Sequence, residues 1–189
     1  MSHVEKIVMK KLLFLFFLVP FLANAQVQSN EINWISWSEV EAKMAEEPRK
    51  VVVDVYTKWC GPCKIMNKTT FHDPTIVSYI NENYYAIKFD AEGPETINFK
   101  GAEYKNEGYD PNRRGRNATH DLTKAIAPVN GRIAYPTLVY LDEEFRKLTG
   151  VQGLQRPEQL LPILSFFAED AYKEMTWEEY TSQAGSSAN

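Results

Sequence analysis

The sequence predicts an α/β protein whose central mixed sheet carries helices on both faces. The first observation is the β-branched run at 51–56, which is typical of a buried central strand. The second is the order of the elements, in which strands and helices alternate until two strands follow one another near the end. A strand, helix, strand, helix, strand, strand, helix order of this kind favours a sheet with both parallel and antiparallel neighbours.

The helices are predicted from their capping residues and apolar spacing. Ser36 and Glu39 form a capping-box pattern, and Asp73 followed by Pro74 supplies an N-cap and a first helical position. Pro162 would cost a hydrogen bond inside the last main helix, so the regular part of that helix begins either near 157 or only at Pro162. The expected helical segments lie at 36–47, from the cysteine pair onward, and at 73–81, 119–127, 157–172 and 176–183.

The remaining strands are predicted from short aromatic and aliphatic runs. They lie at 84–89, 137–141 and 146–150, and the last two are joined by an acidic turn at 142–144. No internal repeat interrupts this series.

Residues 91–118 have no periodicity, because glycine, proline and charges of both signs are scattered through them. We expect an insertion that adds little to the core, since loops of this length are usually functional or disordered. Arg113, Arg114 and Arg116 are interpreted as a solvated charge run, with a docking patch as the alternative. Because the segment leads into the helix before Tyr135, we also expect it to select the partner without taking part in the chemistry.

The first 25 residues have the pattern of a signal peptide. Three lysines precede an uncharged apolar run at 12–22, and an Ala-Asn-Ala pattern ends at Ala25. The run is shorter than the roughly 20 residues that span a bilayer, so no stable membrane insertion is expected after cleavage. Met9 is an alternative start. The mature protein would then be one exported, periplasmic domain of residues 26–189.

Composition excludes some classes of partner. The chain has 21 basic and 25 acidic residues, and without residues 1–25 these become 18 and 24, a net charge of −6. Nothing in this balance indicates nucleic acid or an anionic membrane surface as a partner.

Both cysteines of the chain, Cys60 and Cys63, are separated by two residues. A structural zinc needs four ligands, and neither His72 nor His120 is spaced to complete such a set, so no metal is expected. A staple across so small a loop would stabilise little. The third alternative, a redox couple, has a mechanism. Cys60 at a helix N-terminus is favoured as a thiolate and should be the less buried cysteine, while Cys63 would resolve its mixed disulfide.

The residues around the pair closely resemble a known family. Asp54-Val55-Tyr56-Thr57-Lys58-Trp59-Cys60-Gly61-Pro62-Cys63-Lys64 resembles the active-site segment of thioredoxin, and Tyr135-Pro136-Thr137-Leu138 resembles its cis-proline segment. The stretch at 70–74 looks more like the thioredoxin-like domain of bacterial exported thiol–disulfide interchange reductases. The resemblance covers about 34–172 apart from the insertion, and it implies a thioredoxin fold.

The resemblance also implies roles for individual residues. Asp54 matches a buried acid that accepts a proton from the resolving cysteine, with a solvent-facing strand acid as the alternative. Lys88 matches a lysine near that acid and fits a surface position equally well. Tyr135 stands where small cytosolic thioredoxin usually has an aliphatic residue, which bears on client contact and redox poise. The residues expected to contact the substrate are Trp59, Gly61, Pro62, Tyr135 and Pro136.

The function implied is that of an exported thiol–disulfide oxidoreductase that reduces protein disulfides without a further cofactor. The Gly-Pro pair between the cysteines is found in reducing members of the family, and electrons would come from a membrane-embedded donor protein. Two alternatives remain at this stage. The same fold serves as a disulfide oxidase or isomerase, or as a binding module that holds an extended client with little turnover.

Overall fold

The computed structural model of the chain describes residues 30–186, and the predicted signal peptide at 1–25 lies outside the described residues. The four-stranded sheet has the order β2-β1-β5-β6. Strand β1 (Lys50–Tyr56) runs parallel to β2 (Tyr84–Asp90) and antiparallel to β5 (Thr137–Leu141). Strand β6 (Lys147–Gln152) pairs antiparallel with β5 at the edge. The predicted mixed sheet is confirmed.

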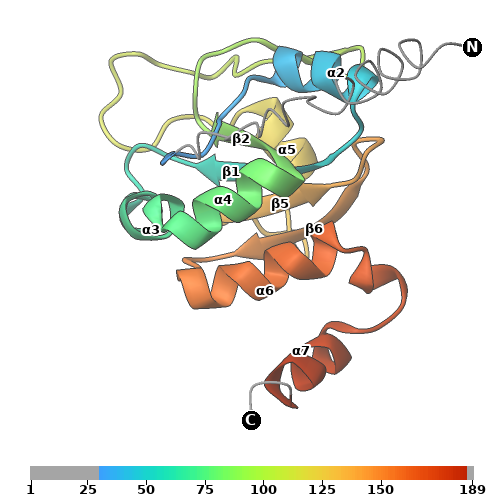
Figure 1. The fold of residues 1–189 in the computed structure, drawn as a ribbon. Coiled ribbons are helices and arrows are strands. Elements are labelled where there is room, and N and C mark those ends of the chain that lie inside the picture. Colours follow the sequence, from blue (N-terminus) through green and yellow to red (C-terminus); the bar gives the residue numbers. More distant parts are fainter. Residues whose placement is uncertain (1–29, 187–189) are drawn as a thin grey trace, which may run out of the picture.

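Helices cover both faces of this sheet (Figure 1). Helices α2 (Trp37–Glu46) and α5 (Asp121–Ile126) pack on one face. Helices α3 (Gly61–Thr69), α4 (Pro74–Asn83) and α6 (Pro157–Ala168) pack on the other. The two faces have separate apolar cores, because successive strand residues point to opposite sides of the sheet.

The predicted caps form as hydrogen bonds. The Ser36 hydroxyl accepts the Glu39 N–H at 3.2 Å, and the Glu39 carboxylate accepts the Ser36 N–H at 2.8 Å. The Asp73 carboxylate accepts the N–H groups of Thr75 and Ile76 at 3.0 and 3.1 Å. These bonds satisfy donors that would otherwise lack an intrahelical partner, and they set where α2 and α4 begin.

The end of the chain differs in detail from expectation. Helix α6 begins at Pro157 and includes Pro162, so the regular helix starts at the first proline and not at the second. It ends at Ala168, before the expected 172, because Asp170 adopts a left-handed conformation with φ of 60°. A 3₁₀ turn, η2 (Ala171–Lys173), and helix α7 (Trp177–Ser186) follow. No helix within residues 30–186 combines the length and apolar character needed to cross a membrane.

Part of the insertion has regular structure and contributes residues to the core. Its first half forms a hairpin of β3 (Ile97–Phe99) and β4 (Ala102–Tyr104), which turns at two residues with positive φ. Ile97 and Phe99 are buried, and the Phe99 ring centroid lies 4.7 Å from that of Trp37 in α2. The expectation that the insertion adds little to the core is therefore wrong for this half. Alternation along β3 turns both apolar side chains toward α2.

Candidate active site

Asp54 lies in the centre of β1 on the sheet face that α3 covers. Val53 and Val55 belong to the core on the α2 side, so alternation turns Asp54 to the opposite face, together with Val52. Its side chain is buried, with 3% of the residue exposed. Burial raises the pKa of the Asp54 carboxyl to about 7, and the nearby Lys88 ammonium offsets part of that rise. The solvent-facing alternative is excluded, and the proton-acceptor role stays a prediction.

Lys88 lies next to this acid, because it pairs in register with Asp54 across β1 and β2. Its Nζ donates a hydrogen bond to the Asn67 side chain on α3 and lies 5.5 Å from the ring centroids of both Trp34 and Tyr56. The side chain is half-buried. Lys88 is therefore held next to α3 by specific contacts, and its part in the reaction stays a prediction.

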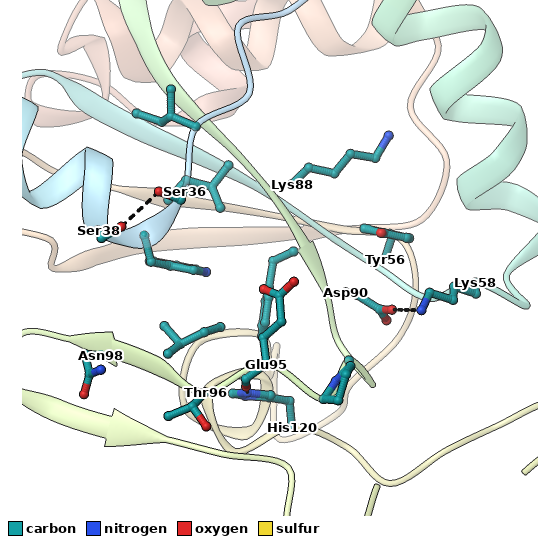
Figure 2. Close-up of a pocket in the computed structure, with 17 residues that line it drawn as sticks. Ser36, Ser38, Tyr56, Lys58, Lys88, Asp90, Glu95, Thr96, Asn98 and His120 are labelled. Carbon is teal, nitrogen blue, oxygen red and sulfur yellow. Dashed lines mark hydrogen bonds and ion pairs between the residues drawn. The ribbon is translucent and has the colours of Figure 1, made fainter. Parts of the chain in front are cut away.

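A cavity of about 530 Å³ lies between the segment before α2, strand β2 and the start of the insertion. Lys58 and Asp90 lie together at one side of it, 3.4 Å apart, and Lys88 points away from the polar groups around His120 (Figure 2). Its charged lining residues have both signs, so it favours neither an anion nor a cation. Within residues 30–186, no cluster of three or more His, Cys, Asp or Glu side chains is arranged to hold a metal ion.

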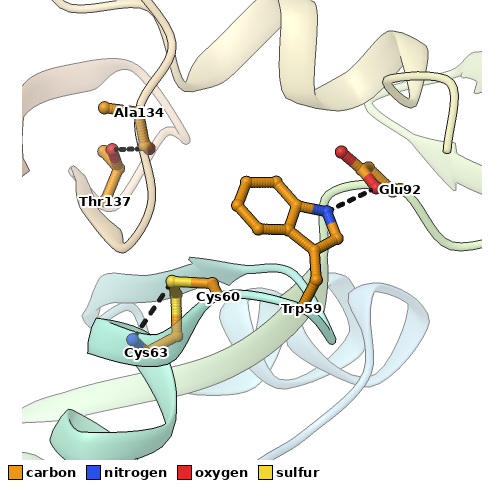
Figure 3. The surroundings of a disulfide bond; sticks show 6 residues. All are labelled: Trp59, Cys60, Cys63, Glu92, Ala134 and Thr137. Atoms are coloured by element: carbon orange, nitrogen blue, oxygen red, sulfur yellow. Dashed lines mark hydrogen bonds between the residues drawn. A yellow bond between two sulfur atoms is a disulfide. The ribbon is translucent and has the colours of Figure 1, made fainter. Parts of the chain in front are cut away.

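The two cysteines form a disulfide at the N-terminus of α3. Cys60 is the N-cap residue, and its Sγ accepts the Cys63 N–H at 3.1 Å (Figure 3). Gly61 and Pro62 fill the exposed first turn of the helix between them. The expectation that Cys60 is the less buried cysteine is wrong for this oxidised form, where Cys60 is 2% and Cys63 6% exposed. The Cys60 sulfur turns inward because it bonds to Cys63 and caps the helix.

The proline loop faces this disulfide from the other side. Tyr135–Pro136 is a cis peptide bond, as the resemblance implies, and Pro136 is buried. The Thr137 hydroxyl donates to the Ala134 carbonyl at 2.7 Å, and these two residues lie across from Cys60 in Figure 3. The structure thus brings together the cysteine pair and the segment expected to contact the client, although they are far apart in the sequence.

Trp59 joins the cysteine turn to the insertion, through contacts that the sequence did not indicate. Its indole Nε1–H donates to Glu92 at 2.9 Å, and the same carboxylate oxygen accepts the Asn117 N–H at 2.6 Å. The Arg116 guanidinium carbon lies 4.4 Å from the Trp59 ring centroid, and the Tyr135 ring meets Trp59 edge-on at 5.9 Å. Arg116 is exposed, as the interpretation of a solvated charge run expects, but its guanidinium group is also stacked on Trp59. Only the fold shows this, since no spacing in the sequence relates position 59 to positions 92 or 116.

Comparison with known proteins bears on the fold of the chain. A thioredoxin-fold protein from Helicobacter pylori superimposes with a TM-score of 0.56 at 16% identity, over 85% of this chain and 91% of that one. The sequence of residues 19–101 matches a family described as protein of unknown function, DUF255, whose profile is labelled as DsbH thioredoxin. The chain therefore has a thioredoxin fold.

The curated relatives that the chain resembles include two thiol:disulfide interchange proteins DsbD. The protein from Vibrio vulnificus is 34% identical over 68 residues, which are 32% of this chain and 11% of that protein. The protein from Pectobacterium atrosepticum is 24% identical over 154 residues, which are 79% of this chain and 22% of that protein. The chain thus spans only a small part of the length of these relatives, and the similarity is confined to that part.

Proposed function

We propose that the protein is an exported thiol–disulfide oxidoreductase that reduces disulfides in client proteins. The observation that carries this proposal is the Cys60–Cys63 disulfide at the N-terminus of α3, with the buried Asp54 on the strand beneath that helix. The unpaired N–H groups of a helix start stabilise a thiolate, which is the reactive form in disulfide exchange. A disulfide with a purely structural role would need neither the helix N-terminus nor the buried acid.

Reduction of a client takes two exchange steps. The Cys60 thiolate attacks one sulfur of the client disulfide, which forms a Cys60–client disulfide and releases the second client sulfur as a thiolate that takes up a proton. Cys63 then gives its proton to Asp54 and attacks the Cys60 sulfur. This forms the Cys60–Cys63 bond and releases the first client sulfur as a thiolate, which takes up a proton from solvent. Two electrons have passed to the client, and the protein is left in the disulfide form that the structure describes.

Asp54 is suited to accept that proton near neutral pH. Its pKa of about 7 leaves a substantial fraction ionised at pH 7, while the ionised form is a far stronger base than a solvated carboxylate. Lys88, in register on β2, limits the rise in pKa and keeps it within that useful range.

The direction of electron flow rests on Gly61 and Pro62, the pair that the reducing members of the family carry. Each cycle needs a dithiol that re-reduces Cys60–Cys63, and a membrane-embedded donor protein would supply it outside the cytosol. The names of the DsbD relatives, thiol:disulfide interchange proteins, support this class of chemistry. Export rests on the leader pattern of residues 1–25.

The experiment separates the two cysteines by trapping. A Cys63→Ser variant should accumulate mixed disulfides with client proteins, because Cys60 attacks and nothing resolves the product. A Cys60→Ser variant should trap none. Trapping by Cys60→Ser alone would reverse the assignment, and trapping by neither variant would overturn the proposal.

Two further measurements address direction and turnover. A reduction potential of the Cys60–Cys63 couple near the roughly −270 mV of thioredoxin agrees with a reductant, whereas one near the roughly −120 mV of a strong oxidant reverses the flow. Catalytic reduction of insulin with dithiothreitol as donor separates an enzyme from a binding module, which would show no turnover.

A further inference from the structure

The second half of the insertion is a closed loop, residues 110–117. Asn117 ties its ends together, since its side-chain Oδ1 accepts the Asp110 N–H at 3.0 Å and its Nδ2 donates to the Asp110 carbonyl at 2.8 Å. A third bond, from the Arg113 N–H to the Asp110 carbonyl at 3.1 Å, tightens the first turn. Unlike the β3–β4 hairpin, this loop adds no residue to the two apolar cores. The loop therefore positions side chains at the surface and does not pack the cores.

The loop is fastened beside the redox disulfide through Glu92. This carboxylate is largely buried, and one of its oxygens accepts both the Asn117 N–H and the indole N–H of Trp59. Figure 3 shows the indole of Trp59, the residue before Cys60, directed toward Glu92. The base of the loop and the residue before the nucleophile thus share one anchor, so the loop has a defined position relative to Cys60.

The loop presents three exposed arginines, Arg113, Arg114 and Arg116. Within residues 30–186 none of the three has a carboxylate within ion-pair distance, while Lys58, which precedes Trp59 in the sequence, is paired with Asp90. Arg116 stacks on Trp59, which restrains its side chain and keeps its charge beside the disulfide. The loop therefore holds three exposed and unpaired positive charges next to Trp59, whereas the nearby carboxylates Glu92 and Asp90 are engaged by a hydrogen-bonded anchor and an ion pair.

We infer that this loop selects client proteins whose disulfide is flanked by acidic side chains. The inference rests on the proposed function and names the class of substrate for the same site. Guanidinium groups bind carboxylates with paired, charge-assisted hydrogen bonds, and Arg beside Trp and Tyr is the composition of recognition hot spots. A cationic rim also speeds the encounter with an anionic partner and slows it with a cationic one.

The test uses three synthetic peptides, each closed by one disulfide whose neighbouring residues are all Glu, all Gln or all Lys. The dithiothreitol-reduced protein is mixed with each peptide in a single turnover, and acid-quenched products are separated to give a second-order rate constant. Each constant is divided by that of dithiothreitol alone with the same peptide, which removes the intrinsic reactivity of the disulfide.

The normalised rate should fall in the order Glu, Gln, Lys, with about 3- to 10-fold between Glu and Gln at low salt, as expected from one or two exposed charge pairs. Raising the ionic strength to about 1 M should remove most of that difference, because the Debye length falls to about 3 Å. In the Arg113→Gln, Arg114→Gln, Arg116→Gln triple variant, the Glu-to-Gln ratio should fall to near 1.

A matched control removes the same charge elsewhere. Lys43, Lys124 and Lys173 are exposed on α2, α5 and η2, and their triple replacement by Gln should leave the Glu-to-Gln ratio as in the unmodified protein. Equal normalised rates with all three peptides, or an equal loss of preference in both triple variants, would overturn the inference while leaving the proposed function intact. Failure to reduce any of the peptides would overturn the proposed function, and the inference with it.

Discussion

Replacing Asp54 with Asn should stabilise the oxidised protein at neutral pH and change it little near pH 4. The carboxyl has an ordinary pKa of 3.8 in the unfolded chain, and burial in the fold raises it to about 7. At low pH the group is protonated in both states. As the pH rises above 3.8, the unfolded chain releases this proton while the folded protein retains it, so unfolding becomes progressively easier until the folded group also ionises.

The magnitude follows from the two pKa values. Each pKa unit corresponds to about 1.4 kcal/mol, so the ionisation of Asp54 removes about 4 kcal/mol of folding free energy between about pH 4 and pH 7. Asn cannot ionise and avoids this loss. The difference in unfolding free energy between Asp54→Asn and the unmodified protein should therefore increase by about 4 kcal/mol across this range and stay constant above it.

The assay is urea unfolding at a series of pH values from about 4 to about 8, with the disulfide intact so that no thiol titrates. Asp121→Asn is the matched control. Asp121 is exposed, and its hydrogen bond from Lys124 lowers its pKa, so its carboxylate stays ionised in both states through most of this range. Parallel stability curves for Asp54→Asn and the unmodified protein would refute the assignment of a raised pKa to Asp54.

The same substitution should slow the second exchange step. Without an acceptor for the Cys63 proton, release of the client from the mixed disulfide should become slower near neutral pH, and its dependence on pH around 7 should disappear. Quenched-flow measurement of client release provides the rate. An unchanged pH–rate profile would leave Asp54 as a buried strand residue without a part in the chemistry.

Three other substitutions test separate features of the structure. Phe99→Ala should destabilise the protein by about 3–5 kcal/mol in urea unfolding, as for other buried aromatic residues, and a loss below about 1 kcal/mol would show that β3 is peripheral to the core. Lys88→Met should raise the pKa of Asp54 above about 7, because the ammonium that favours the carboxylate is removed. The pH midpoint of client release should rise with that pKa. An unshifted midpoint would show that the two groups do not interact. Asp73→Ala should cost about 1 kcal/mol of unfolding free energy through the lost N-cap of α4, and an unchanged value would mean that water replaces the cap.

Much of the fold was determined locally, and these parts could be predicted from the sequence alone. The capping residues Ser36 and Asp73, and the β-branched run of β1, act through hydrogen bonds and apolar spacing within a few residues of each other. The C-x-x-C pair at a helix start is equally local. The sequence therefore determined the order of the elements outside the insertion, the fold class and the position of the redox pair.

Contacts between distant segments were decided only by the tertiary structure. Ile97 and Phe99 became core residues because the β3–β4 hairpin folds back onto Trp37, and no local pattern separates such a hairpin from a surface loop. Glu92 connects Trp59 to Asn117 only because the chain returns to the cysteine turn after 25 further residues. Burial of Asp54 likewise depends on α3 covering its strand, and that burial is what raises its pKa into the range of the reaction.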